Sequence, residues 1–437
     1  MDVNSFVIGY NKGKASAPAG AGVELNIAYG DTPPEDTSKL WVKTSEPSKV
    51  TIQPNMDGFA FEDELKKQTT FSNIAHACSA VSGNNMYIIG GASSTNAMTQ
   101  KVVNKIYRSS ATYWYNDNGK ITTPQPMMRA CAVAYDTLIY TFGGYSTWNN
   151  SVNAWILCID TVASTCNSFS ISLPYSLQFG CCARVGDKTY IFGGNTKKDA
   201  SGRTGKILRF VPENSTIEQT AEEFPTGIQN MCCEAVGTKI YLFGGNTATD
   251  GTVDTIYCFD TETETLLLLE TRLPVPLAGA ACASIGDYIY IFGGCVDFNA
   301  PTHSYNIYRF NTQTHRIEKT SASMPKGVYA LCANTVDYDG NGTERIFLAG
   351  GGEYTSSNFA VTNVSNEISV YAPSEDFELP NGDMLIITDS ESNVFTVASA
   401  ADTKIEIGVS DVFKGDSENI GKLTEAALYK DGTWTTI

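Results

Sequence analysis

The stretch Lys188-Thr-Tyr-Ile-Phe-Gly-Gly194 is one of six copies of a pattern that decides the fold of this 437-residue chain. In each copy a short apolar segment ends in two consecutive glycines, and an aromatic residue stands three positions before the pair. The pairs are Gly90-Gly91, Gly143-Gly144, Gly193-Gly194, Gly244-Gly245, Gly293-Gly294 and Gly350-Gly351. Their regular interval of about 50 residues predicts an architecture in which every copy builds one small structural unit.

Each copy also predicts four short antiparallel strands. An apolar strand precedes the glycine-ended strand, and dipeptides such as Gly186-Asp187 and Gly286-Asp287 suit a two-residue hairpin turn between the two. A third strand follows a polar loop after the glycines, and in most copies a fourth strand comes next. The expected third strands lie at 105–107, 154–156, 207–210, 256–259, 307–310 and 368–371. The paired glycines permit positive φ and leave room for the neighbouring unit.

Six such units resemble the kelch β-propeller, and the resemblance covers about residues 71–371. It implies an all-β fold, with a six-bladed kelch propeller at 71–380 and a small C-terminal β module at 381–437. The last copy lacks a clear fourth strand, so residues 1–70 are expected to supply an N-terminal closing strand that removes the unpaired edge. The candidates are 40–43, 49–53 and 59–65, among which the sequence does not choose.

Composition and charge disfavour several classes of partner. The chain has 30 Lys and Arg against 47 Asp and Glu, a net charge of −17, and no basic run. This balance argues against nucleic acid and against an anionic membrane surface. Because no signal peptide and no membrane-spanning apolar run is evident, we expect synthesis in the cytoplasm without a signal peptide and no membrane insertion.

The twelve cysteines show no zinc-binding spacing. Alignment of the copies places six of them at one position of the first strand, which is innermost in kelch propellers: Cys78, Cys131, Cys182, Cys233, Cys282 and Cys332. A free thiol there acts as a small apolar side chain, so we expect reduced cysteines, no metal and no cofactor. The segment Asp337–Gly342 opens like a calcium loop, but Leu348 stands where a bidentate Glu is required, and a simple turn is the alternative.

Comparison with the enzymes known on this fold gives little indication of a catalytic site in this sequence. Copper oxidases of the kelch class need two histidines, and His76, His303 and His315 are not expected to converge. Kelch sialic acid mutarotases gather arginine and glutamate over the channel mouth, where Arg129 and Glu353 could stand. A sugar mutarotase is therefore kept as an alternative to a non-enzymatic protein.

The flanks carry a second resemblance. Segments 28–43, 405–416 and 427–434 look like the flanks of kelch proteins of gut Firmicutes and their phages or prophages, where they occur in tail-associated structural proteins. The resemblance implies a bacterial context, a place in the virion tail and contact with other tail proteins.

The loops after the glycine pairs are rich in aromatic and amide residues, which stack on sugars and hydrogen-bond them. The candidate ligand-binding residues are Tyr145, Trp148, Asn195, Asn246, Asp297, Phe298, Glu353 and Tyr354. The sequence thus favours a recognition module, a phage tail-associated structural or receptor-binding protein that contacts a host surface glycan or protein. An intracellular protein-interaction scaffold is the competing interpretation.

Overall fold

The computed structural model divides into two compact units, each considered by itself: residues 1–58 with 373–437, and residues 59–372. The described part of the second unit comprises 73–92, 100–108, 114–116, 120–298, 300–324, 326–338, 340, 342–355, 361–366 and 368–372. Outside these ranges, the description is confined to β1 (Ile27–Gly30), β2 (Leu40–Lys43), β3 (Gly58–Ala60), β36 (Phe377–Leu379), β37 (Met384–Thr388), β38 (Val394–Ala398), β39 (Ile405–Ile407), β40 (Glu425–Lys430) and β41 (Thr433–Thr436).

The described residues of the second unit form six main sheets, one for each glycine pair. The first sheet contains β4 (Cys78–Ser82), β5 (Asn85–Ile89), β6 (Gln100–Arg108), β7 (Trp114–Asn116) and β8 (Ile121–Met127). The second sheet contains β9 (Cys131–Tyr135), β10 (Leu138–Phe142), β13 (Ile156–Asp160) and β14 (Thr165–Ser168). The third sheet contains β15 (Cys181–Val185), β16 (Lys188–Phe192), β17 (Lys206–Val211) and β18 (Thr216–Glu223). The fourth sheet contains β20 (Cys232–Val236), β21 (Lys239–Phe243), β24 (Thr255–Asp260) and β25 (Thr265–Arg272). The fifth sheet contains β26 (Ala281–Ile285), β27 (Tyr288–Phe292), β30 (Asn306–Asn311) and β31 (Ile317–Ser323). The sixth sheet contains β32 (Tyr329–Asp337), β33 (Glu344–Tyr354), β35 (Ile368–Ala372) and β3. Antiparallel pairing follows the expected order, except that the third strand of the second sheet is β13 at 156–160 rather than 154–156.

Short elements occupy the loops that follow the glycine pairs. They are β11 (Tyr145–Ser146), β12 (Ser151–Val152), η1 (Ala200–Gly202), β19 (Ile228–Gln229), β22 (Asn246–Thr247), β23 (Gly251–Thr252), β28 (Cys295–Asp297), β29 (Thr302–His303) and β34 (Val361–Thr362). Most of them pair in two- or three-stranded ribbons, so these loops have defined backbone structure.

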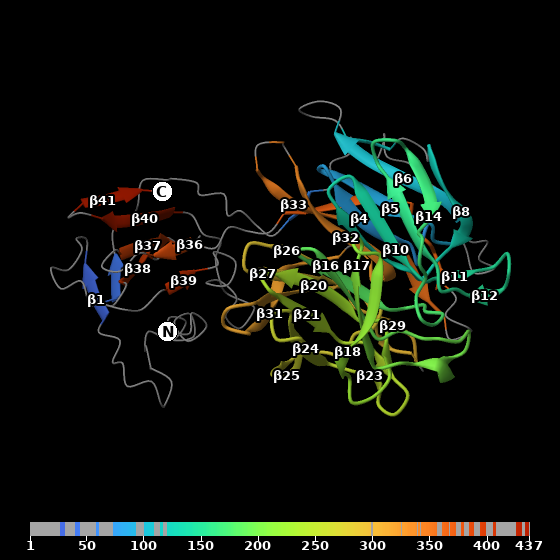
Figure 1. Ribbon diagram of the computed structural model, residues 1–437. Helices are drawn as coiled ribbons and strands as arrows, with labels where there is room; N and C mark the ends of the chain where they lie inside the picture. Colours follow the sequence, from blue (N-terminus) through green and yellow to red (C-terminus); the bar gives the residue numbers. More distant parts are fainter. Residues whose placement is uncertain are drawn as a thin grey trace. The chain divides into compact units, whose positions relative to one another are not determined.

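The sheets close into a ring. The innermost strands contact one another in the order β4, β9, β15, β20, β26 and β32, and β32 returns to β4 (Figure 1). The outer strand of the last sheet is β3, which pairs with β35 and comes from the amino-terminal side of the repeats. The all-β fold with an N-terminal closing strand is thus confirmed, and the strand overlaps the third candidate stretch. The predicted boundaries at residues 70 and 380 stay a prediction.

The glycine pairs join each sheet to the next. In every pair the second glycine donates its N–H to a backbone carbonyl shortly before the next inner strand, as Gly245 does to Leu277 O at 2.7 Å and Gly351 does to Ile74 O at 2.9 Å. The first glycine leaves no room for a side chain, because a Cβ on Gly244 would lie 2.0 Å from Leu277 O. All twelve glycines have positive φ, so both conformation and space require glycine.

A second set of backbone hydrogen bonds runs around the ring just before the innermost strands. The N–H of Arg129 donates to His76 O at 2.8 Å, and each later member donates to the one before it until His76 N donates to Ala330 O at 3.0 Å. The six members are His76, Arg129, Phe179, Asn230, Gly279 and Ala330, and we call them the backbone ring. All six have φ between 57° and 66°. The closed circuit links all six sheets at one end of their inner strands.

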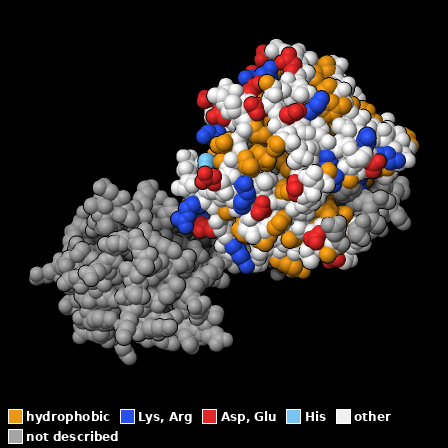
Figure 2. Space-filling view, turned by 90° about the horizontal axis from the view of Figure 1, so that it is seen from below, with side chains coloured by type: hydrophobic (Ala, Val, Ile, Leu, Met, Phe, Trp, Pro, Cys, Tyr) orange, Lys and Arg blue, Asp and Glu red, His pale blue; other side chains and the backbone are white. Residues whose placement is uncertain are grey.

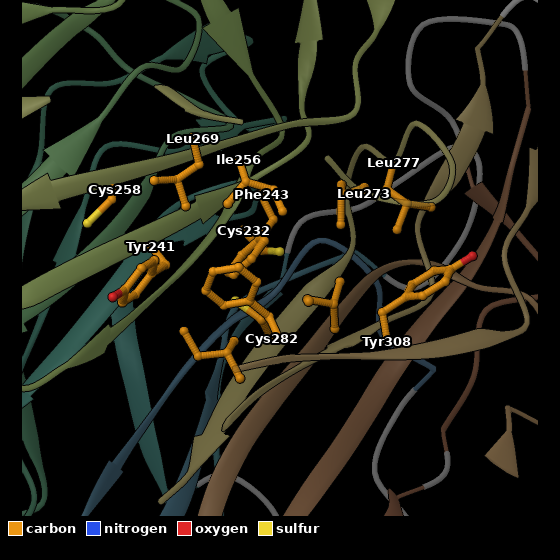
Figure 3. Close-up of a cluster of buried hydrophobic side chains, with 13 residues drawn as sticks. Cys232, Tyr241, Phe243, Ile256, Cys258, Leu269, Leu273, Leu277, Cys282 and Tyr308 are labelled. Carbon is orange, nitrogen blue, oxygen red and sulfur yellow. The ribbon is translucent and has the colours of Figure 1, made fainter. Parts of the chain in front are cut away.

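Apolar side chains between neighbouring sheets form the core. Figure 3 shows one such cluster, which contains Tyr241 and Phe243 of the fourth sheet and Tyr308 of the fifth. Aromatic pairs such as Phe243 and Phe310, 5.3 Å apart and edge-to-face, recur between sheets. The aromatic residues before each glycine pair therefore fill the space between blades, where burial of an aromatic side chain contributes roughly 2–3 kcal/mol.

The alignment of the cysteines was wrong by one residue in three repeats. Hairpin register places Cys181 opposite Phe192 and Cys232 opposite Phe243, as Cys131 lies opposite Phe142. We number as position 1 the inner-strand residue that lies opposite the last residue before each glycine pair. Position 1 carries Cys78, Cys131, Cys181, Cys232, Ala281 and Cys332. Cys182, Cys233 and Cys282 occupy position 2, the next residue along the strand. Adjacent cysteines made both alignments possible, and the hairpin register distinguishes them.

The first unit contains a six-stranded sheet in the order β1-β2-β38-β37-β40-β41, and β36 pairs with β39. The strands expected in a C-terminal module thus share a sheet with β1 and β2 from the amino-terminal flank, which removes 40–43 from the candidates for closing the propeller. In the part of the chain that the structure describes, no helix is long and apolar enough to cross a membrane.

Candidate functional site

The backbone ring and the loops after the glycine pairs lie at the same end of the sheets. The first residue after each pair bridges to the residue just before a ring member, as in Met128 with Tyr145 and Gln178 with Asn195. The hairpin turns between the first two strands lie at the opposite end of those strands. Side chains from the ring and from these loops can therefore meet on one face.

Arg129 lies at the centre of these side chains. Its guanidinium carbon lies 4.6 Å from the Phe179 ring and 5.6 Å from the Tyr145 ring. Nη1 donates to Gln178 Oε1 at 3.4 Å. Burial lowers the pKa of Arg129 to about 10, and Tyr329, Tyr145 and Tyr354 act in the opposite direction. The side chain stays protonated at neutral pH, so a cation is held among aromatic rings, a contact that contributes about 2 kcal/mol when desolvated.

Three more aromatic residues extend this group. Phe298 meets the Tyr354 ring edge-to-face at 4.4 Å, and Tyr329 lies 5.3 Å from Tyr354 and 5.7 Å from Phe298. We call the set the Arg129 cluster: Arg129, Tyr145, Phe179, Phe298, Tyr329 and Tyr354. It unites residues from the second, third, fifth and sixth repeats. Burial raises the pKa of Tyr354 to about 12, so its hydroxyl remains a neutral donor.

An amide donor borders the cluster. Tyr329 Oη donates to Asn230 Oδ1 at 3.3 Å, whereas the buried Nδ2 of Asn230 has no acceptor among the described residues. A buried donor without an acceptor costs about 1–3 kcal/mol. A ligand oxygen at this point would recover that free energy.

The predicted site residues separate into three groups. Tyr145, Phe298 and Tyr354 join the Arg129 cluster. Trp148 is exposed (66%), and Glu353 is exposed with Oε2 accepting from Asn363 Nδ2 at 2.8 Å. Asp297 is half-buried beside Phe298 in the chain.

Asn195 and Asn246, two of the predicted site residues, are buried, and their side-chain amides stabilise the loops. Asn195 Nδ2 donates to Gln229 Oε1 at 2.9 Å and to Asp199 O at 2.7 Å, and its Oδ1 accepts from Lys197 N. Asn246 Oδ1 accepts from Arg203. Both side chains therefore hold loop conformation. Sequence reasoning overlooked Phe179, Asn230 and Tyr329, although Phe179 and Asn230 stand two residues before an inner strand, at the same offset as Arg129.

Two of the three histidines border the Arg129 cluster. His76 meets Phe179 at 5.7 Å and Tyr329 at 5.3 Å, and His303 Nε2 accepts from Tyr354 N at 2.7 Å. Both thus border the same aromatic group, whereas His315 stacks on Phe310 elsewhere. Burial lowers the pKa of His303, which suits its acceptor role, and Glu353 opposes the shift. Within the described ranges, no group of three or more His, Cys, Asp or Glu is placed to hold a metal ion.

The calcium candidate forms a turn where it is described. Asp337 Oδ1 accepts from Gly340 N at 2.8 Å and from Gly342 N at 3.1 Å. The other expected oxygen ligands, Asp339 and Asn341, lie outside the described residues.

Acidic and basic side chains are interspersed on the face of the molecule seen in Figure 2, and Lys and Arg do not form a single patch there.

Comparison with known proteins agrees with the ring of repeated sheets. Residues 179–374, which span the third to the sixth repeat, match the family model of the KLHDC2/KLHL20/DRC7 Kelch-repeats domain. The chain contains a kelch-repeat domain. Kelch-repeat domains are typically non-enzymatic modules of protein interaction. No curated protein matches the chain.

Proposed function

We propose that this protein is a non-enzymatic recognition module whose kelch domain binds a ligand through the Arg129 cluster. The observation that carries the proposal is a cation held 4.6 Å from the Phe179 ring and surrounded by tyrosines on the face formed by the post-glycine loops. Aromatic faces stack on apolar ligand surfaces, while a guanidinium and an amide donor orient oxygen atoms. This combination suits a glycan that carries hydroxyl and acidic groups.

We further propose that the protein is associated with a phage or prophage tail, where the face that carries the Arg129 cluster contacts a host surface glycan. Two of the three flanking segments that resemble tail proteins contribute strands to the six-stranded sheet: β1 and β2 from residues 28–43, and β40 and β41 from 427–434. A separate module built from both flanks suits attachment to other tail proteins. A host surface protein is the alternative ligand for the same face.

Binding to a glycan array and to purified host cell-wall fractions tests the proposal. Arg129→Gln removes the cation and leaves the backbone hydrogen bonds of the ring, so we expect at least tenfold weaker binding, about the value of one charged hydrogen bond. The double variant Tyr145→Ala, Trp148→Ala tests the aromatic contribution. Lys239→Gln is the matched control, because it removes one positive charge from an exposed residue beside the hairpin turn of β20 and β21, at the opposite end of the strands, and should bind like the native protein.

Equal binding by Arg129→Gln and the native protein would remove this face from consideration. Binding to protein fractions that protease treatment abolishes, with no glycan bound, would replace the glycan by a protein ligand. Melting temperatures close to that of the native protein verify that each variant is folded.

A further inference from the structure

Eight of the twelve cysteines lie at positions 1 and 2 of the innermost strands. They are Cys78, Cys131, Cys181, Cys182, Cys232, Cys233, Cys282 and Cys332. As whole residues, five of them are 5–8% exposed and three are half-buried, in contrast to Cys295 at 0%. We call this circle of cysteines on the inner strands the thiol belt.

The hairpin registers and the contacts between inner strands make the belt a series of pairs. Across three junctions, a cysteine at position 1 of one inner strand and a cysteine at position 2 of the next pack in the same apolar cluster between sheets: Cys131 with Cys182, Cys181 with Cys233, and Cys232 with Cys282. Figure 3 shows Cys232 and Cys282 beside each other in the cluster between the fourth and fifth sheets. The same offset brings Cys332 to Ser79 at the junction between the last and the first sheet.

The remaining junctions break the series. At these positions Cys78 meets the strand that carries Ala132, and Ala281 meets the strand that carries Ala333. Three junctions thus hold two thiols each, and the others hold at most one. The pairs arise because β15 and β20 each carry two adjacent cysteines. One of the two pairs with a cysteine of the preceding inner strand, and the other pairs with a cysteine of the following inner strand.

Two ligands per site restrict the ions that fit. Zinc and iron–sulfur centres require four ligands in a tetrahedral arrangement, and the described residues hold no suitable group of three or more. Copper(I) is a soft ion that thiolates select, and it is stable with two sulfur ligands in a line. Burial raises the pKa values of Cys182, Cys233 and Cys282, so these thiols are protonated without metal. A bound cation reverses this, because a coordinating thiol loses its proton.

We propose that the three thiol pairs of the belt bind Cu(I), one ion between each pair. Each ion displaces two protons and forms two copper–sulfur bonds, and its oxidation state does not change. The thiol pairs share no residue with the Arg129 cluster, so the tests of copper binding and of ligand recognition can fail independently of each other.

Anaerobic titration of the full chain with Cu(I), against a chromogenic copper(I) chelator, tests the proposal. The native protein should withhold about three ions from the chelator, since soft-metal sites with matched ligands outcompete isolated thiols. The triple variant Cys182→Ser, Cys233→Ser, Cys282→Ser removes one thiol from every pair and should withhold none. Its matched control, Cys158→Ser, Cys258→Ser, Cys295→Ser, loses the same number of thiols outside the belt and should behave like the native protein.

Single variants keep the test decisive if the triple variant fails to fold. Cys182→Ser alone should lower the stoichiometry by one ion, and X-ray absorption should report two sulfur ligands per copper. Equal loss by the belt and control variants, or equal binding by the urea-unfolded chain, would show that copper binds to thiols in general and would overturn the proposal. Three sulfur ligands per ion would also contradict it.

Discussion

Replacement of Glu234 by Gln should stabilise the kelch domain at alkaline pH. Glu234 is the third residue of β20, lies half-buried on the inner strand, and accepts from Ser284 Oγ at 2.9 Å. Burial raises the pKa of its carboxyl group from 4.5 to about 7, and the Ser284 hydrogen bond offsets this in part. Because the folded state holds this proton more tightly than the unfolded state, the free energy of unfolding falls as pH rises from 4.5 to about 7.

The magnitude follows from the two pKa values. At about 1.4 kcal/mol per pKa unit, the difference between 4.5 and about 7 corresponds to about 3 kcal/mol, lost in full above pH 7. Glu234 retains some contact with solvent, which screens the charge, so we expect about 1–3 kcal/mol. Gln keeps the acceptor for Ser284 and has no charge to desolvate. Glu234→Gln should therefore be more stable than the native protein by this amount at about pH 8.5, and by less at about pH 5.5.

Urea unfolding followed by tryptophan fluorescence at both pH values measures the difference. Subtraction of the native curve from the variant curve cancels the titration of all other groups. Glu213→Gln, an exposed site, is the control and should show no pH-dependent difference. A variant whose advantage does not grow with pH, or which is less stable than the native protein at pH 8.5, would refute the reasoning.

The closing strand, the thiols and one crowded glycine provide three further tests. Deletion of residues 1–60 removes β3 and exposes the edge of β35, so we expect aggregation or a lower melting temperature for the propeller, whereas deletion of 1–50 retains β3 and the propeller transition. All twelve cysteines should react as free thiols in denaturant without reductant, and a count well below twelve would contradict the expectation. A Cβ on Gly279 would lie 2.0 Å from Tyr329 Cε2, so Gly279→Ala should cost about 3 kcal/mol in chemical denaturation. Gly286→Ala, at similar φ in open space, should cost about 1 kcal/mol.

The architecture was predictable because its main determinants are backbone requirements visible in the sequence. A glycine pair is needed wherever one sheet approaches the carbonyl of the next, as at Gly244 and Leu277, and no other residue can replace it. The repeat thus marks all six sheets. The closing strand was harder to assign, since β3 has only three residues, lies outside the repeats and pairs with β35.

The site was predicted in part, and the failures have physical causes. Asn195 and Asn246 have the residue types of a sugar-binding loop, but their amides satisfy buried groups within the loops. Sequence alone cannot tell a loop amide that faces solvent from one that caps its own loop. Phe179 and Tyr329 escaped notice because aromatic residues next to apolar strands are ordinarily core, and only the ring brings them to Arg129.

The backbone ring explains how one position can serve both the fold and recognition. Its members are His, Arg, Phe, Asn, Gly and Ala, so the hydrogen bonds that close the propeller make no demand on side-chain type. The demand falls on conformation: five non-glycine residues adopt left-handed φ, at roughly 1–2 kcal/mol each. The closed circuit of hydrogen bonds and the packing around it offset this cost. The side chains are then free to vary, and Arg129 can be changed for function while the ring that holds it remains intact.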